Sequence, residues 1–151
     1  MELILWRHAE AEFGEPDHGR ALSAKGRKQA AKMAEWLDSK LPERCRILVS
    51  PATRCLQTAE ALKRKFKPHP ALAPDATPAQ ALAAAGWPDS REPVLLIGHQ
   101  PLLGQTASLL ICGHLQDWTI RKAQVWWIVQ RARGAVADNY LRAVMAPDLL
   151  A

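Results

Sequence analysis

Residues 3–12 read LILWRHAEAE, an apolar run that ends abruptly in an arginine and a histidine. Consecutive apolar residues of this kind are typical of a strand that is covered on both faces. In α/β proteins the carboxyl ends of such strands are where ligands bind. Arg7 and His8 therefore occupy a position suited to binding an anion, although an ordinary polar loop would also account for them.

Two further strands are predicted from the same pattern, and each also ends in polar residues. Residues 46–49, RILV, are followed by Ser50-Pro51 and, one turn into the next helix, by Arg54. Residues 93–97, PVLLI, are followed by Gly98-His99. Because the carboxyl ends of parallel strands share one edge of a sheet, we expect two arginines and two histidines to converge in one crevice. Such a cluster would attract a small dianion, and the planar fork of arginine matches phosphate oxygens.

Helical periodicity separates these strands. Ser23 is predicted to cap a helix that ends before Pro42. Apolar residues recur along this helix at three- and four-residue spacing and form one face. That face comprises Ala30, Met33, Ala34, Leu37 and Leu41, and the face of a second helix comprises Leu56, Ala59, Leu62 and Phe66. Thr77-Pro78 begins a third helix, which ends at Gly86, and a fourth spans about residues 102–112.

The remaining segments complete an α/β pattern. Residues 67–78 hold four prolines and are expected to form a surface connection with a short strand inside it. Two strand candidates lie near residues 117–129 and 138–145, joined by a short turn from Arg131 to Gly134. Trp126-Trp127 is expected to pack on both faces of the sheet. The sequence therefore predicts a three-layer α/β/α fold, with a mainly parallel sheet, helices on both faces and an antiparallel edge strand.

Length and composition predict one globular domain over residues 1–151, with 48% hydrophobic and 23% charged residues. No apolar run is long enough to span a membrane, and the N-terminus lacks the basic start of a secretory signal. We therefore expect a soluble cytoplasmic protein without membrane partners. In that compartment structural disulfides are rare, so Cys45, Cys55 and Cys112 are interpreted as small apolar residues.

The net charge of +5 favours acidic partners but is too diffuse to indicate nucleic-acid binding. The densest basic cluster, KRKFK at residues 63–67, is interpreted as a helix C-terminus, where cations suit the helix dipole, with a docking patch as the alternative. Among five histidines there is no H-x-x-x-H or H-E-x-x-H spacing, so no metal site is predicted.

The motifs at the three strand ends resemble those of one protein family. LWRHAEAE, residues 5–12, resembles the R-H-G signature of the histidine phosphatase superfamily, whose fold is called phosphoglycerate mutase-like. SPATRCLQTA, residues 50–59, is similar to its second motif, S-P-x-x-R-x-x-Q-T-A, and IGHQP, residues 97–101, resembles its third, G-H-x-P. The chain length and RALSAKG, residues 20–26, most resemble SixA-type phosphohistidine phosphatases. One departure is Ala9, where the family usually has glycine.

The resemblance implies a mechanism without metal or cofactor. His8 would attack phosphorus and form a covalent phosphohistidine, which water then hydrolyses, so that one difficult step becomes two easier ones. A free imidazole has a pKa of about 6.5, so much of it is neutral and nucleophilic at pH 7. Arg7, Arg54 and His99 would hold the three peripheral phosphate oxygens, with His99 acting best as a cation.

A leaving group often needs a proton, and four acidic residues lie in the first loop: Glu10, Glu12, Glu15 and Asp17. Asp17 is the preferred candidate for a general acid, but the sequence does not distinguish it from the others. Arg20 is interpreted either as a phosphate-binding residue or as a surface arginine near a helix start. Gln57 and Thr58 are expected to position Arg54 and its helix rather than to touch substrate.

Three functions remain open from the sequence. The chain has little spare length for a lid, so an open basic crevice favours phosphohistidine on another protein, such as a histidine phosphotransfer domain. The alternative is a small phosphomonoester, for example a sugar or nucleotide phosphate. A third reading is a non-catalytic module that binds phosphate on the same scaffold.

Overall fold

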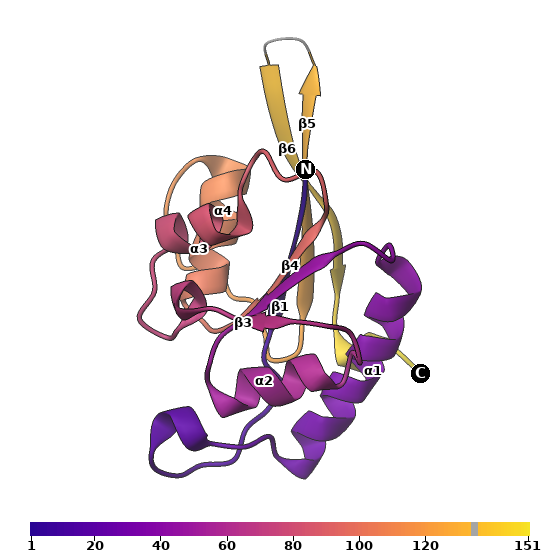
Figure 1. The fold of residues 1–151 in the computed structure, drawn as a ribbon, viewed down its shortest axis with the longest axis vertical. Coiled ribbons are helices and arrows are strands. Elements are labelled where there is room, and N and C mark those ends of the chain that lie inside the picture. Colours follow the sequence, from indigo (N-terminus) through magenta and orange to yellow (C-terminus); the bar gives the residue numbers. More distant parts are fainter. Residues whose placement is uncertain (134–135) are drawn as a thin grey trace.

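The computed structural model describes residues 1–133 and 136–151, and it places the strands of this part in one mixed sheet (Figure 1). The strands are β1 (Glu2–Arg7), β2 (Arg46–Val49), β3 (Lys67–Pro68), β4 (Val94–Gly98), β5 (Val125–Arg133) and β6 (Val136–Met145). The helices are α1 (Ala24–Lys40), α2 (Thr53–Glu60), α3 (Pro78–Ala85) and α4 (Leu102–Cys112). Short 3₁₀ turns are η1 (Asp17–Gly19), η2 (Pro70–Leu72) and η3 (Pro147–Leu149).

The sheet has a parallel half and an antiparallel half. Its strand order is β3-β2-β4-β1-β5-β6. β4 pairs in parallel with both β1 and β2, whereas β5 runs antiparallel to β1 and to β6. The parallel strands β1, β2 and β4 therefore end at one edge, and Arg7 lies opposite Gly98 in the register. The mainly parallel order with an antiparallel edge confirms the fold class that the sequence predicted.

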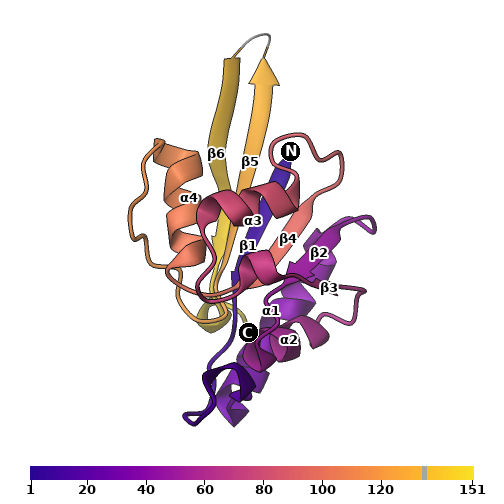
Figure 2. The same ribbon diagram turned by 60° about the vertical axis from the view of Figure 1, so that its left-hand side comes forward.

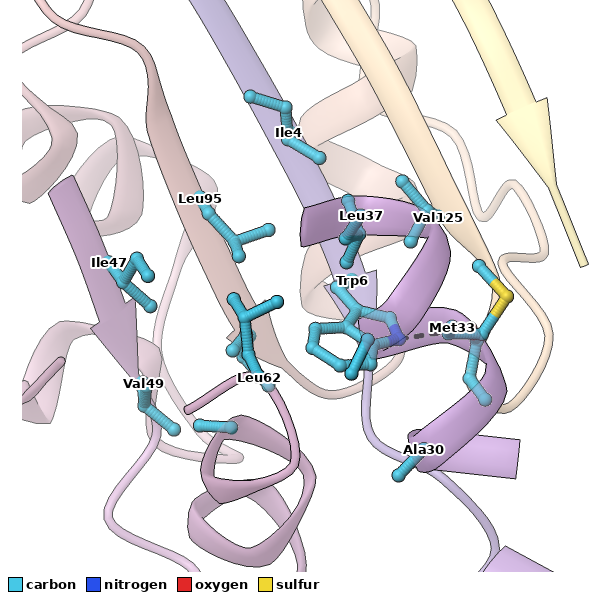
Figure 3. Close-up of a cluster of buried hydrophobic side chains, with 14 of the residues drawn as sticks. Ile4, Trp6, Ala30, Met33, Leu37, Ile47, Val49, Leu62, Leu95 and Val125 are labelled. Atoms are coloured by element: carbon cyan, nitrogen blue, oxygen red, sulfur yellow. Dashed lines mark hydrogen bonds between the residues drawn. The ribbon is translucent and has the colours of Figure 1, made fainter. Parts of the chain in front are cut away.

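Helices cover both faces of the sheet, because successive side chains of each central strand point to opposite sides. Figure 2 shows α3 and α4 on one face and α1 and α2 on the other. Ile4 and Trp6 pack in the α1 layer with Met33 and Leu37 (Figure 3), and Leu3, on the other face of β1, packs in the α3 and α4 layer. The two tryptophans of β5 divide in the same way, with Trp127 in the first cluster and Trp126 against the second.

Two predicted boundaries were wrong. The second helix was expected to reach Phe66, but α2 ends at Glu60, and Lys63 follows with a φ of 57°. A left-handed residue cannot continue a right-handed helix, so the basic cluster at residues 63–67 is not a helix C-terminus. The strand expected from residue 117 begins at Val125 instead. The segment before it is irregular, although it buries Ile120 and Ala123.

The turn expected from Arg131 to Gly134 was partly wrong, because β5 continues to Arg133. Gly134 lies outside the described residues.

All three cysteines are free thiols. Cys55 is buried, Cys45 is half-buried and Cys112 is exposed, so the interpretation as small apolar residues fits Cys55 best. None of the described helices is long and apolar enough to cross a membrane.

Candidate active site

The carboxyl edge of the parallel strands holds a cavity of about 430 Å³. Arg7 is the last residue of β1 and His8 follows it. His99 follows β4, and Arg54 lies in the first turn of α2. The His8 amide donates to the Gly98 carbonyl (3.0 Å), which locks the two strand ends together. The structure thus brings the four residues predicted from separate motifs together in one cavity, which Arg20 also lines.

The backbone sets the protonation of His8. Its Nδ1 lies 2.8 Å from the carbonyl oxygen of Ala9, which only accepts hydrogen bonds, so the proton sits on Nδ1. The Nε2 lone pair is then free to attack an electrophile. Burial, with smaller contributions from the charges of His99, Arg54 and Arg7, lowers the pKa of His8 to about 3, although the hydrogen bond to Ala9 raises it. His8 is therefore neutral at pH 7. The methyl group of Ala9 is fully buried in the core and leaves this geometry intact.

His99 is also neutral in this state. Its Nε2 lies 2.7 Å from Ser50 Oγ, and its Nδ1 accepts from Arg54 Nη2 at 3.2 Å, so the single ring proton sits on Nε2. Burial, and then the positive charge of Arg54, lower the pKa of His99 to about 4. The cationic form that would best hold phosphate is thus not the resting form. A bound dianion would have to supply the field that protonates this ring.

Half-buried Arg7 and buried Arg54 bring two positive charges to the cavity. Burial, and then the charge of Arg54, lower the pKa of Arg7. Arg7 Nη1 donates to the Ile120 carbonyl (3.0 Å), but within the described residues neither Arg7 Nε nor Arg54 Nε has a hydrogen-bond partner. Buried N–H groups of this kind are nearly always paired. Arg54 has Asp17 as a counter-ion, whereas Arg7 forms no ion pair among the described residues, so an oxyanion in the cavity would compensate the charge of Arg7.

Asp17 makes a different contact from the one expected of a proton donor. Its carboxylate accepts from Arg54 Nη2 (3.3 Å) and from Arg20 Nε (3.1 Å), and its carbonyl accepts from Arg54 Nη1 (3.0 Å). Desolvation raises the pKa of Asp17, but the charges of Arg54 and Arg20 outweigh it and hold the pKa below its usual range. The geometry therefore favours a counter-ion of Arg54 over a general acid.

Three supports position this site, two of which the sequence singled out. Thr58 Oγ1 accepts from the Ala9 amide and donates to the Arg54 carbonyl, and Gln57 Oε1 accepts from the Leu22 amide. Both contacts agree with the expectation that these residues position the site. The role of Ser50 as the partner of His99 was missed. Its only sequence signal was its place as the first residue of the S-P-x-x-R motif.

Gly26 allows the first turn of α1 to pack closely against the loop that follows His8. A Cβ built on Gly26 would lie 1.9 Å from the carbonyl oxygen of Glu10, which is closer than any real contact. The same turn is held by Ser23, whose Oγ caps α1 on the Gly26 amide and donates to Glu10 Oε2. The glycine of the R-x-L-[ST]-x-x-G stretch is thus required because the first turn of α1 packs directly on the Glu10 backbone.

No three His, Cys, Asp or Glu side chains cluster as a metal site among the residues described. The cavity therefore combines a neutral imidazole with guanidinium donors at the carboxyl edge of a parallel sheet. This arrangement is suited to binding a phosphoryl group.

Comparison with known proteins assigns the family. The sequence model of the histidine phosphatase superfamily (branch 1) matches residues 3–77, and the chain belongs to that superfamily and is a hydrolytic phosphatase. An uncharacterised protein of Picosynechococcus sp. is 33% identical over an alignment of 166 positions that covers 99% of each chain.

Solved structures agree on the fold. The protein histidine phosphatase SixA, in a complex with tungstate, superimposes with a TM-score of 0.79 at 24% identity over 99% of both chains. A putative phosphohistidine phosphatase SixA from Agrobacterium tumefaciens gives a TM-score of 0.79 at 23% identity over 97% of both chains. The predicted phosphoglycerate mutase-like, SixA-like fold is confirmed.

Proposed function

We propose that this phosphatase works without a metal, through a covalent phosphohistidine on His8, and removes phosphate from phosphohistidine on another protein. The observation that carries the proposal is the state of His8. The Ala9 carbonyl holds its proton on Nδ1 and leaves Nε2 unprotonated, in a cavity lined by guanidinium groups.

The reaction can proceed with the residues of the cavity and protons from solvent. The substrate enters with its phosphorylated imidazole protonated by solvent on the other ring nitrogen. The Nε2 lone pair of His8 forms a bond to phosphorus while the P–N bond of the substrate breaks, and the substrate ring keeps that electron pair and leaves as neutral imidazole. The phosphorylated ring of His8 retains its Nδ1 proton and becomes cationic, and the Ala9 carbonyl 2.8 Å away stabilises that charge. Water then attacks phosphorus, the P–Nε2 bond breaks, and neutral His8 is restored. Arg7, Arg54 and a protonated His99 would hold the oxygens throughout.

The state of Asp17 supports a phosphohistidine substrate over a phosphate ester. An alkoxide leaving group requires a proton donor, whereas an imidazole departs more readily. Asp17, the preferred candidate, is charged and ion-paired to two arginines, so it is not ready to protonate an alkoxide, and the other acidic side chains that line the cavity are Glu10 and Glu12. The structurally similar SixA proteins are a protein histidine phosphatase and a putative phosphohistidine phosphatase, which agrees with this substrate class. A small phosphomonoester is the alternative, and then Asp17 would have to give up its arginines to act as the acid.

Trapping the phosphoenzyme tests the proposal. Enzyme mixed with a ³²P-phosphohistidine protein and quenched in alkaline detergent should retain label that is stable to alkali and lost in acid. His8→Ala should remove the label, whereas His114→Ala, in an exposed loop, should leave it unchanged. Label that persists in His8→Ala would reject the nucleophile. No label from any donor would favour a non-catalytic phosphate-binding module, and label from small esters alone would favour the small-molecule alternative.

A further inference from the structure

A second cavity, of about 660 Å³, adjoins the active site. The two cavities share Arg7, Glu10 and Lys122 in their walls, so they lie side by side. We call the second cavity the α1 groove. It lies between α1, the irregular segment before β5 and the η3 turn near the C-terminus, which lies beside α1 in both ribbon views (Figures 1 and 2).

The α1 groove is strongly cationic. Lys25, Lys28 and Lys32 recur at three- and four-residue spacing and therefore line one side of α1, while Arg121 and Lys122 face them from the other wall. All five side chains are exposed, and in the part of the chain that the structure describes none of them forms an ion pair. Lys32 Nζ only donates to the Leu150 carbonyl, at 3.5 Å.

This positive charge is local and is not simply the average of a basic surface. Six residues that line the groove are cationic and two, Glu10 and Asp148, are anionic, a surplus close to the net +5 of the whole chain. Glu10 is engaged by Ser23 Oγ at 2.8 Å, which reduces its opposition to an incoming anion. The positive charges that line the groove repel one another, so a partner that carries carboxylates would stabilise them.

An exposed aromatic side chain also lies at the catalytic cavity. Phe13, in the first loop, is 99% exposed and lines this cavity. Large aromatic residues are enriched among the anchors of protein interfaces. A cationic groove and a fully exposed phenyl ring beside one catalytic cavity form a surface that a protein could engage in addition to its phosphate.

We infer that the α1 groove docks an acidic segment of the phosphoprotein substrate beside its phosphohistidine, through Lys25, Lys28 and Lys32. This inference rests on the proposed function and deepens it by naming the chemistry of the partner. A nucleic acid is the weaker occupant, because Glu10 and Asp148 would oppose a continuous phosphodiester backbone, whereas a discrete pattern of carboxylates can avoid them. The three lysines span about 10 Å along α1, which two or three carboxylates of an acidic segment can match.

Phosphohistidine peptides test the inference directly. One peptide carries six glutamates beyond a four-residue Gly-Ser spacer from the phosphohistidine, and its partner carries six glutamines, with the tail placed on either side in separate syntheses. At low salt kcat/KM should be at least about tenfold higher for the glutamate peptide, and 0.5 M salt should remove the difference because charges at an exposed rim are screened. Equal rates with the two tails on both sides would overturn the inference.

Charge reversal locates the effect. Lys25→Glu/Lys28→Glu/Lys32→Glu should reduce the preference to below about twofold and leave hydrolysis of phosphoramidate, a small N–P compound, unchanged. The control Arg44→Glu/Lys65→Glu/Lys67→Glu makes the same change in net charge at exposed positions outside the groove and should keep the preference. A preference that survives in the α1 variant, or is lost equally in the control, contradicts docking in the groove.

Failure of the docking inference can be separated from failure of the proposed function. If no phosphohistidine peptide is hydrolysed, the proposed substrate is wrong, and the groove is judged by the anisotropy of a fluorescent, unphosphorylated glutamate peptide. Binding to the wild type that the α1 variant loses supports the groove, and no binding overturns it. Tighter binding of a 12-nucleotide single-stranded RNA, lost in the same variant, would assign the groove to nucleic acid and also overturn the inference.

Discussion

Arg54 and Arg20 line the same cavity, yet Arg54 is 4% exposed on its floor, whereas the Arg20 side chain is 24% exposed in the first loop. The floor, formed by Arg7, His8, Arg54 and His99, is anchored to strand ends and bonded to the backbone. The first-loop wall carries Asp17 and Arg20, whose side chains form ion pairs that are open to screening by solvent.

This difference in exposure determines how strongly each positive charge interacts with a bound oxyanion. A guanidinium group on the desolvated floor acts on an oxyanion in a medium of low dielectric constant, whereas one on the wall is screened by solvent. The floor should therefore supply the rate acceleration, and the wall should tune access and affinity.

The largest expected effect is the loss of a donor from the floor. Arg54→Ala should lower kcat/KM on phosphoramidate by about 10²–10³, the range seen when one donor to a transition-state oxyanion is removed. Arg20→Ala, the matched change on the wall, should cost less than about tenfold, because exposed charge pairs contribute about 0.2–1 kcal/mol each. Steady-state kinetics on folded variants, checked by circular dichroism, measure both values. Similar losses in the two variants would remove the distinction between floor and wall.

The next effect is a dependence of stability on pH that arises from the floor alone. Folding lowers the pKa of His8 to about 3 and that of His99 to about 4, so between those values and about 6.5 the unfolded chain binds more protons. Stability should therefore be full above pH 6.5 and fall on acidification, with each histidine contributing up to about 1.4 kcal/mol per pH unit.

Urea unfolding at pH 7, 6 and 5 measures this slope. His8→Gln should flatten it and His114→Gln, at an exposed position, should not. Activity on phosphoramidate should not decline between pH 7 and 5 through protonation of His8, because its pKa lies well below that window. A wild-type slope that His8→Gln leaves unchanged would show that the folded pKa of His8 is not depressed.

A smaller effect tests how closely α1 packs on the loop that joins the floor to the wall. Gly26→Ala places a methyl group 1.9 Å from the Glu10 carbonyl and should destabilise the fold by about 1–3 kcal/mol, the usual cost of overpacking. Gly19→Ala, in the first loop, meets only an ordinary contact of 3.7 Å with Pro16 and should change stability little. Thermal melting of the two variants checks this. Equal melting temperatures would mean that α1 moves away from the loop at low cost.

The sequence predicted the floor better than the wall, for a physical reason. The strands that end at the floor are runs such as residues 3–6 and 94–97, buried on both faces, so local hydrophobicity alone identifies them. Once those strands are parallel, the motif residues at their ends must meet. The register of β1 and β4, with Arg7 opposite Gly98, fulfils that expectation.

What the sequence left open depends on contacts between distant segments. The proton positions on His8 and His99 depend on the Ala9 carbonyl and on Ser50 and Arg54, and no local pattern encodes them. The pairing of Asp17 with Arg54, 37 residues away, likewise appears only in three dimensions. The early end of α2 depends on Lys63, whose backbone is left-handed. Lysine rarely adopts this conformation, and the local sequence does not predict it.

The smallest effect distinguishes the two roles of Asp17. If its carboxylate is the counter-ion that phosphate displaces from Arg54, Asp17→Asn should tighten the inhibition constant of inorganic phosphate by about two- to fivefold, the scale of an exposed ion pair. kcat on phosphoramidate should stay unchanged. Asp38→Asn is the matched control, because Asp38 is equally exposed (59%) and pairs with Arg64 outside the cavity. Weaker phosphate binding, with a loss of turnover on an O–P ester and not on phosphoramidate, would instead make Asp17 the proton donor, and the wall would then take part in the chemistry that we assign to the floor.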